Sequence, residues 1–396
     1  MPQIKPEVEA FARIKVIGIG GSGKNAVNHM INSKVKGVEF ISINTDAQDL
    51  HNSLATKKIH IGKNLTRGLG TGMNPELGKR AAEETKEEIQ EALKGSDMAF
   101  IAYGAGGGTG SGASPLISKI AKEMGILTVG VVTKPFFFEG IQRMKIAEQS
   151  LEELRKGVDA LIIIPNDRLL STISRETTAK QAFAMCDDIL KQAVEGISDL
   201  ITMPGIINTD FADIRAIMEN AGSALMGIGI AGGENRAIEA AKSAISSPLL
   251  ELSIAGAKGV LFSIAGGDDL TMFEIQDAAK LITESIDPNA RVIFGTVHDD
   301  RLKKNELKIT VIASGFSDIS NKKSLFQNVV TNKEEDKKAK LFGTFGSANN
   351  SEPKTETQPT QSTQQMPTEE KKPMKSDFDD DSDWGAVPAF LRRQKK

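Results

Sequence analysis

The sequence predicts an α/β protein with a doubly wound, mostly parallel sheet, a long central helix, a second α/β domain with a mixed sheet, and a disordered tail. Apolar strand-like runs alternate with helical patterns over residues 11–167, which is typical of a parallel sheet covered by helices on both faces. Residues 178–202 form one long helical pattern with little interruption. From residue 318 the sequence becomes polar, which favours disorder.

The first domain is expected to span residues 11–177, after a flexible N-terminus of residues 1–10. Apolar runs predict its strands at residues 13–20, 38–44, 58–62, 98–103, 127–134 and 160–165. Helical spacing predicts its helices at residues 26–33, 75–93, 114–124 and 140–156.

A central helix, assigned to residues 178–204, is expected to link two domains. At ~1.5 Å per residue its helical pattern spans nearly ~40 Å, more than the width of one domain requires. In the second domain, residues 205–317, helices are predicted at residues 211–221, 234–245 and 271–285. Its strands are predicted at residues 259–264, 290–297 and 307–313, and because they cluster late we expect a mixed sheet.

The C-terminal part divides into a disordered linker, residues 318–376, and a terminal peptide, residues 377–396. The peptide is acidic, then apolar, then basic, which suits a short segment that folds in the groove of a partner. Direct attraction to anionic lipid is the weaker alternative, because the peptide has four basic residues and no long amphipathic helix.

Composition excludes several classes of function. The chain has 396 residues and a net charge of −3, so nothing suggests bulk attraction to nucleic acid. A single cysteine, Cys186, indicates a reducing compartment. The N-terminus lacks the apolar segment of a secretory signal, and no apolar run reaches the ~18 residues of a membrane span.

Residues 104–112, GAGGGTGSG, connect a predicted strand to a predicted helix. Amides at the start of a helix point outward and carry the positive end of its dipole, so a phosphate is the natural ligand. Two more glycine loops, at residues 18–23 and 68–72, follow from the same sheet, and all three are expected to converge at its carboxyl edge. Three loops suit a chain of phosphates held from several sides, which favours a nucleoside triphosphate.

Residues 18–25, GIGGSGKN, also fit two simpler patterns. Gly18, Gly20 and Gly23 match a dinucleotide fingerprint, with Asp46 at about the right distance to bind a ribose hydroxyl. The segment nearly matches a P-loop, but Asn25 replaces the Ser or Thr that would hold Mg²⁺. An NAD-dependent oxidoreductase is therefore one alternative, although it needs only one glycine turn.

Two pairs at i, i+4 spacing are candidates for recognising a nucleoside. Phe183 and Asp187 share a face of the long helix, where a ring could stack on a base and a carboxylate could accept from the N–H groups of guanine. A core phenylalanine beside a solvated aspartate is an equally good interpretation. Glu139 and Arg143 could contact the ribose and phosphate, or form a weak surface ion pair.

Asp210 and Asp213 lie at i, i+3 spacing at a predicted helix start, within NTDFADIR. Capping of that helix is the common use of such residues. Alternatively, they orient a water molecule for attack on a γ-phosphate. Because they follow the long helix, we expect them on the far side of the molecule from the glycine loops, so a neighbouring subunit would have to supply the phosphate.

The motif GGGTGSG at residues 106–112 resembles the tubulin motif G-G-G-T-G-[ST]-G, and GIGGSGKNAVNHM, NTDAQ, TKPFFFEG, IPND and NTDFADIR occur in the matching order. Over residues 11–316 the chain is identified as a member of the tubulin/FtsZ family, whose bacterial members are cell-division GTPases. The resemblance implies binding of GTP or GDP, with Mg²⁺ held mainly by phosphates and water. It also implies head-to-tail self-assembly into filaments, hydrolysis activated by assembly, and a cytoplasmic mid-cell ring. Residues 383–396 would bind membrane-tethering partners such as the actin-like FtsA.

The resemblance also implies roles for individual residues. Asp210 and Asp213 would act on the nucleotide of the next subunit, Glu139 and Arg143 on the ribose, and Asn166, Phe183 and Asp187 on guanine. Residues 21–25 and 108–110 would hold the phosphates. All the remaining nucleotide contacts that the resemblance implies are Gly20, Gly21, Ser22, Gly23, Lys24, Asn25, Asn44, Asp46, Gly72, Gly106, Gly107, Gly108, Thr109 and Gly110. Lys24 departs from the Gly or Asn expected there, and either adds charge near the phosphates or points to solvent. A tubulin-like scaffold that binds GTP without turnover is the other alternative, and the two aspartates argue against it.

Overall fold

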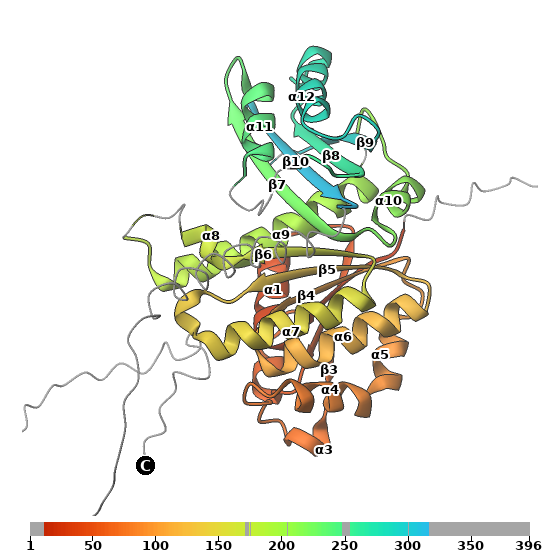
Figure 1. Cartoon of the computed structure of the whole chain (residues 1–396), viewed down its shortest axis with the longest axis vertical. Helices are drawn as coiled ribbons and strands as arrows, with labels where there is room; N and C mark the ends of the chain where they lie inside the picture. The colour runs from red at the N-terminus through yellow and green to blue at the C-terminus, as the bar shows by residue number, and fades with distance from the viewer. Residues whose placement is uncertain are drawn as a thin grey trace, which may run out of the picture. The chain divides into compact units, whose positions relative to one another are not determined.

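The computed structural model describes residues 12–170, 174, 176–203, 205–247, 254–299 and 301–316. Contacts divide the chain into residues 1–328 and 329–396, and every described residue belongs to the first unit. The flexible N-terminus, the linker and the terminal peptide predicted above all lie outside the described residues. The described strands form one ten-stranded sheet in the order β3-β2-β1-β4-β5-β6-β7-β10-β8-β9 (Figure 1).

Six strands in the first half of the chain are parallel to their neighbours, as the alternation of strands and helices predicts. Their near-continuous apolar sequences fit burial on both faces, and every residue of β4 except Gly104 is buried. They are β1 (Ile14–Ile19), β2 (Val38–Asn44), β3 (Lys57–His60), β4 (Met98–Gly104), β5 (Leu127–Lys134) and β6 (Ala160–Pro165).

Helices cover both faces of this parallel part, which confirms the doubly wound arrangement. One core cluster joins the sheet to α1 (Gly20–Asn32) and α9 (Ala179–Thr202), and another joins it to the helices of the opposite face (Figure 1). Those are α4 (Pro75–Glu84), α5 (Lys86–Leu93), α6 (Gly108–Glu123) and α7 (Ile141–Gly157). Short helical segments complete the half: α2 (Ala47–His51), α3 (Lys63–Thr66), η1 (Phe137–Glu139) and α8 (Asn166–Leu170).

Three of the predicted helices differ from those observed. The helices predicted to begin at residues 26 and 114 begin at Gly20 and Gly108, because the glycine turns form their first turns. The single helix predicted over residues 75–93 is two, α4 and α5, separated at Thr85. The Thr85 hydroxyl donates to Ala81 O at 3.2 Å and accepts from Gly62 N at 3.3 Å, so the break is stabilised by a turn distant in sequence.

The second half of the sheet is mixed, as predicted, but it is continuous with the first half. A strand that the sequence did not predict, β7 (Gly222–Gly232), pairs in parallel with the first three residues of β6 and so joins the two halves. Strand β10 (Glu306–Ser314) is antiparallel to both β7 and β8 (Gly259–Gly266), and β9 (Arg291–His298) is parallel to β8. A third core cluster joins these strands to α11 (Arg236–Ile245) and α12 (Met272–Glu284).

Candidate nucleotide-binding site

Most of the predicted site residues of the first half follow directly from the carboxyl ends of parallel strands. Gly20 follows β1, Asp46 lies just after β2, Gly106 after β4, Glu139 after β5, and Asn166 after β6. The registers align these ends, with Ile19 opposite Ile43 and Lys134 opposite Pro165. The carboxyl edge of a parallel sheet is where open α/β folds bind ligands.

The three glycine loops converge at this edge, as predicted. A Cβ on Gly20 would lie 3.1 Å from Gly110 N, so the first and third loops are in contact. The Thr109 hydroxyl lies 3.2 Å from the hydroxyl of Thr71, in the second loop. It also lies 2.6 Å from the hydroxyl of Thr45, which brings in the segment after β2. Sequence reasoning missed both threonine partners of Thr109, because they come from distant segments.

Two helices begin at this edge, and no acidic side chain in either first turn offsets the positive end of the helix dipole. Helices α1 and α6 begin after Ile19 and Gly107, and neither has a side-chain cap or an acidic residue in its first turn. Their first amides therefore present partial positive charge, which suits an anionic ligand. Gly107 has an ordinary φ of −84°, and a Cβ there would meet nothing within 4 Å, so the space beside this helix start is open.

Lys24 does not point to solvent. Its Nζ lies 2.7 Å from Asp49 Oδ1, and its side chain is only 9% exposed. The other oxygen of Asp49 accepts from Asn44 Nδ2 at 2.8 Å, and Asp46 caps α2 by accepting from Asp49 N at 2.9 Å. Asp49 was absent from the sequence prediction, although it lies only three residues after Asp46.

Glu139 and Arg143 form an ion pair at 3.0 Å, with side chains 12% and 24% exposed. The ion pair expected by the alternative is therefore present, although both side chains are mostly covered, and contact with a ribose stays a prediction. Glu139 also accepts from Phe136 N at 2.9 Å, which ties it to the loop after β5.

Phe183 and Asp187 both lie on α9, and Phe183 contacts that same loop. The Phe183 ring is 39% exposed and packs edge-on against Phe136, with ring centroids 5.5 Å apart. Burial raises the pKa of Asp187 to about 7, against the opposing charge of Lys24. Nearby along the sheet edge, Asn166 is buried, and its Oδ1 has no hydrogen-bond partner within the described parts of the chain. A buried acceptor without a partner is the kind of atom that a ligand would satisfy.

Several predicted residues border the site without a polar contact that defines a role. Gly21, Ser22 and Asn25 are exposed on the first turns of α1. Gly72 is exposed in the second loop at φ +57°. These positions are compatible with ligand contact, and their roles stay predictions.

The structure does not bring Asp210 and Asp213 to the glycine loops. Both begin α10 (Phe211–Met218), in which Arg215 Nη2 donates to Asp97 O at 3.4 Å. Asp97 precedes β4, so α10 lies at the amino edge of the sheet. At ~3.3 Å per strand residue, that is about 20 Å from the glycine loops. Both aspartates are exposed, and neither carboxylate has a polar partner among the described residues, so capping does not occupy Asp210.

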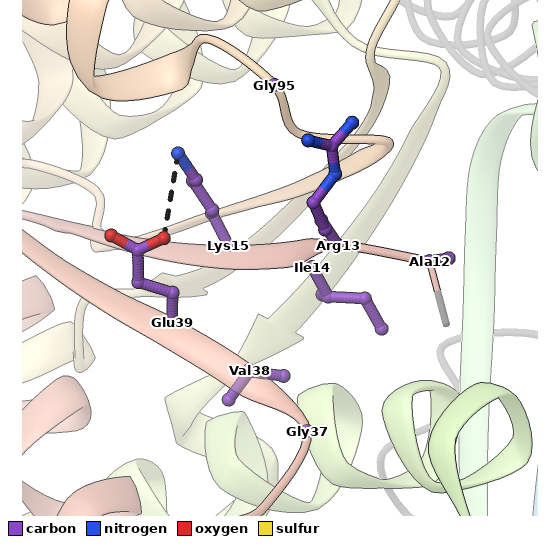
Figure 2. Close-up of a pocket in the computed structure, with 8 residues that line it drawn as sticks. All are labelled: Ala12, Arg13, Ile14, Lys15, Gly37, Val38, Glu39 and Gly95. Atoms are coloured by element: carbon purple, nitrogen blue, oxygen red, sulfur yellow. Dashed lines mark ion pairs between the residues drawn. The ribbon is translucent and has the colours of Figure 1, made fainter. Parts of the chain in front are cut away.

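A cavity of about 480 Å³ also lies at the amino edge, and the predicted site residues do not line it. Two of its charged residues pair with each other, with Lys15 Nζ 3.6 Å from Glu39 Oε2 (Figure 2). It is lined by Ala12, Arg13, Ile14, Lys15, Gly37, Val38, Glu39 and Gly95.

A solved FtsZ from M. jannaschii, described as an empty dimer, is 44% identical to this chain; the match covers 78% of this chain and 89% of that one, with a TM-score of 0.75. The chain belongs to the tubulin/FtsZ family. Residues 13–175 match the Tubulin/FtsZ family GTPase domain, and residues 222–317 match the FtsZ family C-terminal domain. CetZ2 from Haloferax volcanii, described as a GTPγS-bound protofilament, shares the fold at 21% identity, with 82% of this chain and 99% of that chain covered and a TM-score of 0.66.

Membership of the tubulin/FtsZ family makes the chain a GTP-binding GTPase of the cytoskeletal class. Both alternatives left open by the sequence are thereby excluded: the NAD-dependent oxidoreductase and the scaffold without turnover. That the glycine loops at the carboxyl edge hold the nucleotide stays a prediction.

Proposed function

We propose that the chain binds GTP at the carboxyl edge of the sheet, assembles head to tail into filaments, and hydrolyses GTP where two subunits meet. The observation that carries this proposal is the separation of the phosphate loops from Asp210 and Asp213, which lie at opposite edges of one sheet. A contact that brings unlike surfaces together repeats without closing, and so produces filaments.

In the bound state, backbone amides at the starts of α1 and α6 hold the phosphates, while Phe183, Asp187 and Asn166 hold the guanine. Glu139 and Arg143 bind at the ribose. Mg²⁺ supplies charge neutralisation on the phosphates. The nearby carboxylates of Asp46 and Asp49 are already used in a helix cap and an ion pair. We therefore propose that phosphate oxygens and water provide most of the metal's ligands.

Hydrolysis needs no covalent intermediate. The exposed carboxylates of Asp210 and Asp213 enter the site of the next subunit and position the attacking water, and the loop amides stabilise charge on the γ-phosphate. Loss of that phosphate removes contacts from the junction, and the filament weakens.

Exposed apolar side chains on both parts of the chain support such a junction. In the first half, Leu69 is 84% exposed, Phe137 71% and Ile141 86%, all in segments after the carboxyl ends of strands. In the second half, Ile206 is 74% exposed in the loop that leads to Asp210, and Phe273 is 78% exposed at the start of α12. Exposed apolar side chains in two separate parts of the chain suit a heterologous contact.

We further propose that the filaments form the mid-cell ring of dividing bacteria, and that residues 383–396 bind membrane-tethering partners of the FtsA type. That peptide lies outside the described residues. Among the described helices, none is long and apolar enough to cross a bilayer.

The test is GTP turnover per subunit against protein concentration with Mg²⁺, with the same samples pelleted. A threshold in turnover that coincides with pelleting supports a site completed between subunits. Asp213→Ala is expected to bind GTP and to lose turnover, with Glu219→Ala, at the exposed end of the same helix, as the control. Turnover per subunit that is constant from the lowest concentration would overturn the shared site.

A further inference from the structure

The ion pair between Lys24 and Asp49 lies on the wall of the proposed phosphate site. The two residues come from α1 and α2, and their charged atoms are 2.7 Å apart. Asn44 holds the second oxygen of Asp49 at 2.8 Å, which fixes the carboxylate in place. The lysine is 9% exposed and the aspartate 31%, so the carboxylate is the member of the pair that still faces solvent.

The carboxylate of Asp49 borders the first turn of α1. A Cβ built on Gly21 would lie 3.5 Å from Asp49 Oδ2, and Gly21 is among the residues proposed to hold phosphates. A negative charge here would repel a polyphosphate and offset the positive end of the helix. Lys24 removes most of that charge at close range.

We propose that Lys24 sets the affinity of the site for polyphosphate indirectly, by neutralising the carboxylate of Asp49. This inference rests on the proposed nucleotide site. Lys24 is then a positioning residue. The P-loop pattern that residues 18–24 nearly match would place a lysine directly on the phosphates. Here the ammonium group of Lys24 is paired with Asp49 instead.

The test is a cycle of variants titrated with GTP, GDP and guanosine below the assembly threshold. Lys24→Gln exposes the charge of Asp49 and is expected to weaken GTP binding about tenfold, GDP less, and guanosine least, because the repulsion grows with ligand charge. Asp49→Asn leaves Lys24 uncompensated and is expected to tighten GTP binding about threefold or more. The double variant is expected within about threefold of wild type, and Lys24→Arg, which keeps the charge, likewise.

The comparison of Lys24→Gln with the double variant decides the question. Recovery of GTP affinity in the double variant supports neutralisation. A double variant that binds GTP as weakly as Lys24→Gln shows that Lys24 contacts phosphate itself and overturns the inference. Equal losses for GTP and guanosine overturn it as well, since they indicate a purely structural effect.

These failures are distinguishable from failure of the proposed function. If the wild-type chain does not bind GTP, the site assignment is wrong. If the wild-type chain binds GTP and the cycle shows no dependence on charge, only the role of Lys24 is wrong. Far-ultraviolet circular dichroism and thermal unfolding of each variant establish that all four proteins are folded.

Discussion

At the scale of single residues, the buried carboxyl group of Asp187 gives the proposed guanine contact a pH dependence. Its pKa is raised to about 7 by burial, so near neutral pH the empty site holds this group only partly ionised. Guanine offers N1–H and an amine, which require an ionised carboxylate as acceptor. We expect GTP affinity to fall below about pH 7, approaching tenfold per pH unit, when measured by nucleotide titration.

The stability of the empty protein should depend on pH in the opposite sense. The pKa of Asp187 is raised on folding, so its contribution to stability is full below its unfolded value of 3.8 and is lost as pH rises through about 7. Asp187→Asn is therefore expected to stabilise the empty protein above pH 7 by roughly 2 kcal/mol while weakening GTP binding. GTP affinity that is independent of pH in the wild type would show that Asp187 does not bind the base.

A substitution at Gly107 should distinguish an effect on nucleotide affinity from an effect on stability. Gly107→Ala introduces a methyl group that meets no protein atom within 4 Å at an ordinary φ, so thermal unfolding should change little. The methyl group would occupy the open space beside the start of α6, so nucleotide affinity should fall about tenfold or more. Gly18→Ala is the contrast, since its Cβ would lie 2.6 Å from Val27 Cγ2 and should lower stability. Unchanged nucleotide affinity in Gly107→Ala would place the phosphates elsewhere.

At the scale of elements, apolar strands were the most predictable part of the fold. The bounds of β2, β5 and β6 agree with the sequence prediction, because continuous apolar runs between polar turns leave few alternatives. Helix starts were less predictable. Glycine disfavours helix on propensity, yet Gly112 lies inside α6, where a Cβ would lie 2.8 Å from Lys79 N of α4.

The candidate site was also only partly predictable from the sequence. The glycine loops and their common edge followed from the order of strands and helices. The pairing of Lys24 with Asp49, and of Phe183 with Phe136, did not follow, because each joins segments whose separation only the folded chain closes. Local spacing contains no signal for such contacts.

Strand β7 escaped prediction because its sequence, GSALMGIGIAG, has four glycines where a strand usually has branched residues. The packing of α11 explains one of them: a Cβ on Gly229 would overlap Ala240 O and lie 2.7 Å from Ala244 N. We expect Gly229→Ala to destabilise the protein by about 2 kcal/mol or more, since α11 must move away from the sheet. Thermal unfolding measures this, with Ser223→Ala on the same strand as the control. A stability equal to wild type would mean that α11 is not held this closely.

At the scale of the whole molecule, one sheet carries the two halves of the proposed reaction at opposite edges. The amides proposed to bind phosphate lie at the carboxyl edge, and the exposed carboxylates of Asp210 and Asp213 lie beyond the amino edge. No rotation of a side chain spans about 20 Å, so the proposed reaction needs the phosphates of one subunit and the aspartates of another. Assembly and hydrolysis are then coupled by geometry.

Mixing two inactive variants tests that coupling. Asp213→Ala should bind GTP but cannot complete the site of its neighbour. Gly107→Ala retains both aspartates but should be mostly empty at a GTP concentration that only just saturates the wild type. In a random mixed filament of equal parts, about a quarter of the junctions place a bound GTP against an intact pair of aspartates. Turnover in the mixture should therefore rise to about a quarter of wild type. The double variant Gly107→Ala/Asp213→Ala, mixed with Asp213→Ala, should give no rise, because it supplies no intact aspartate pair. A mixture that is only as active as its separate components, although it pellets as mixed filaments, would show that each chain contains its whole catalytic site.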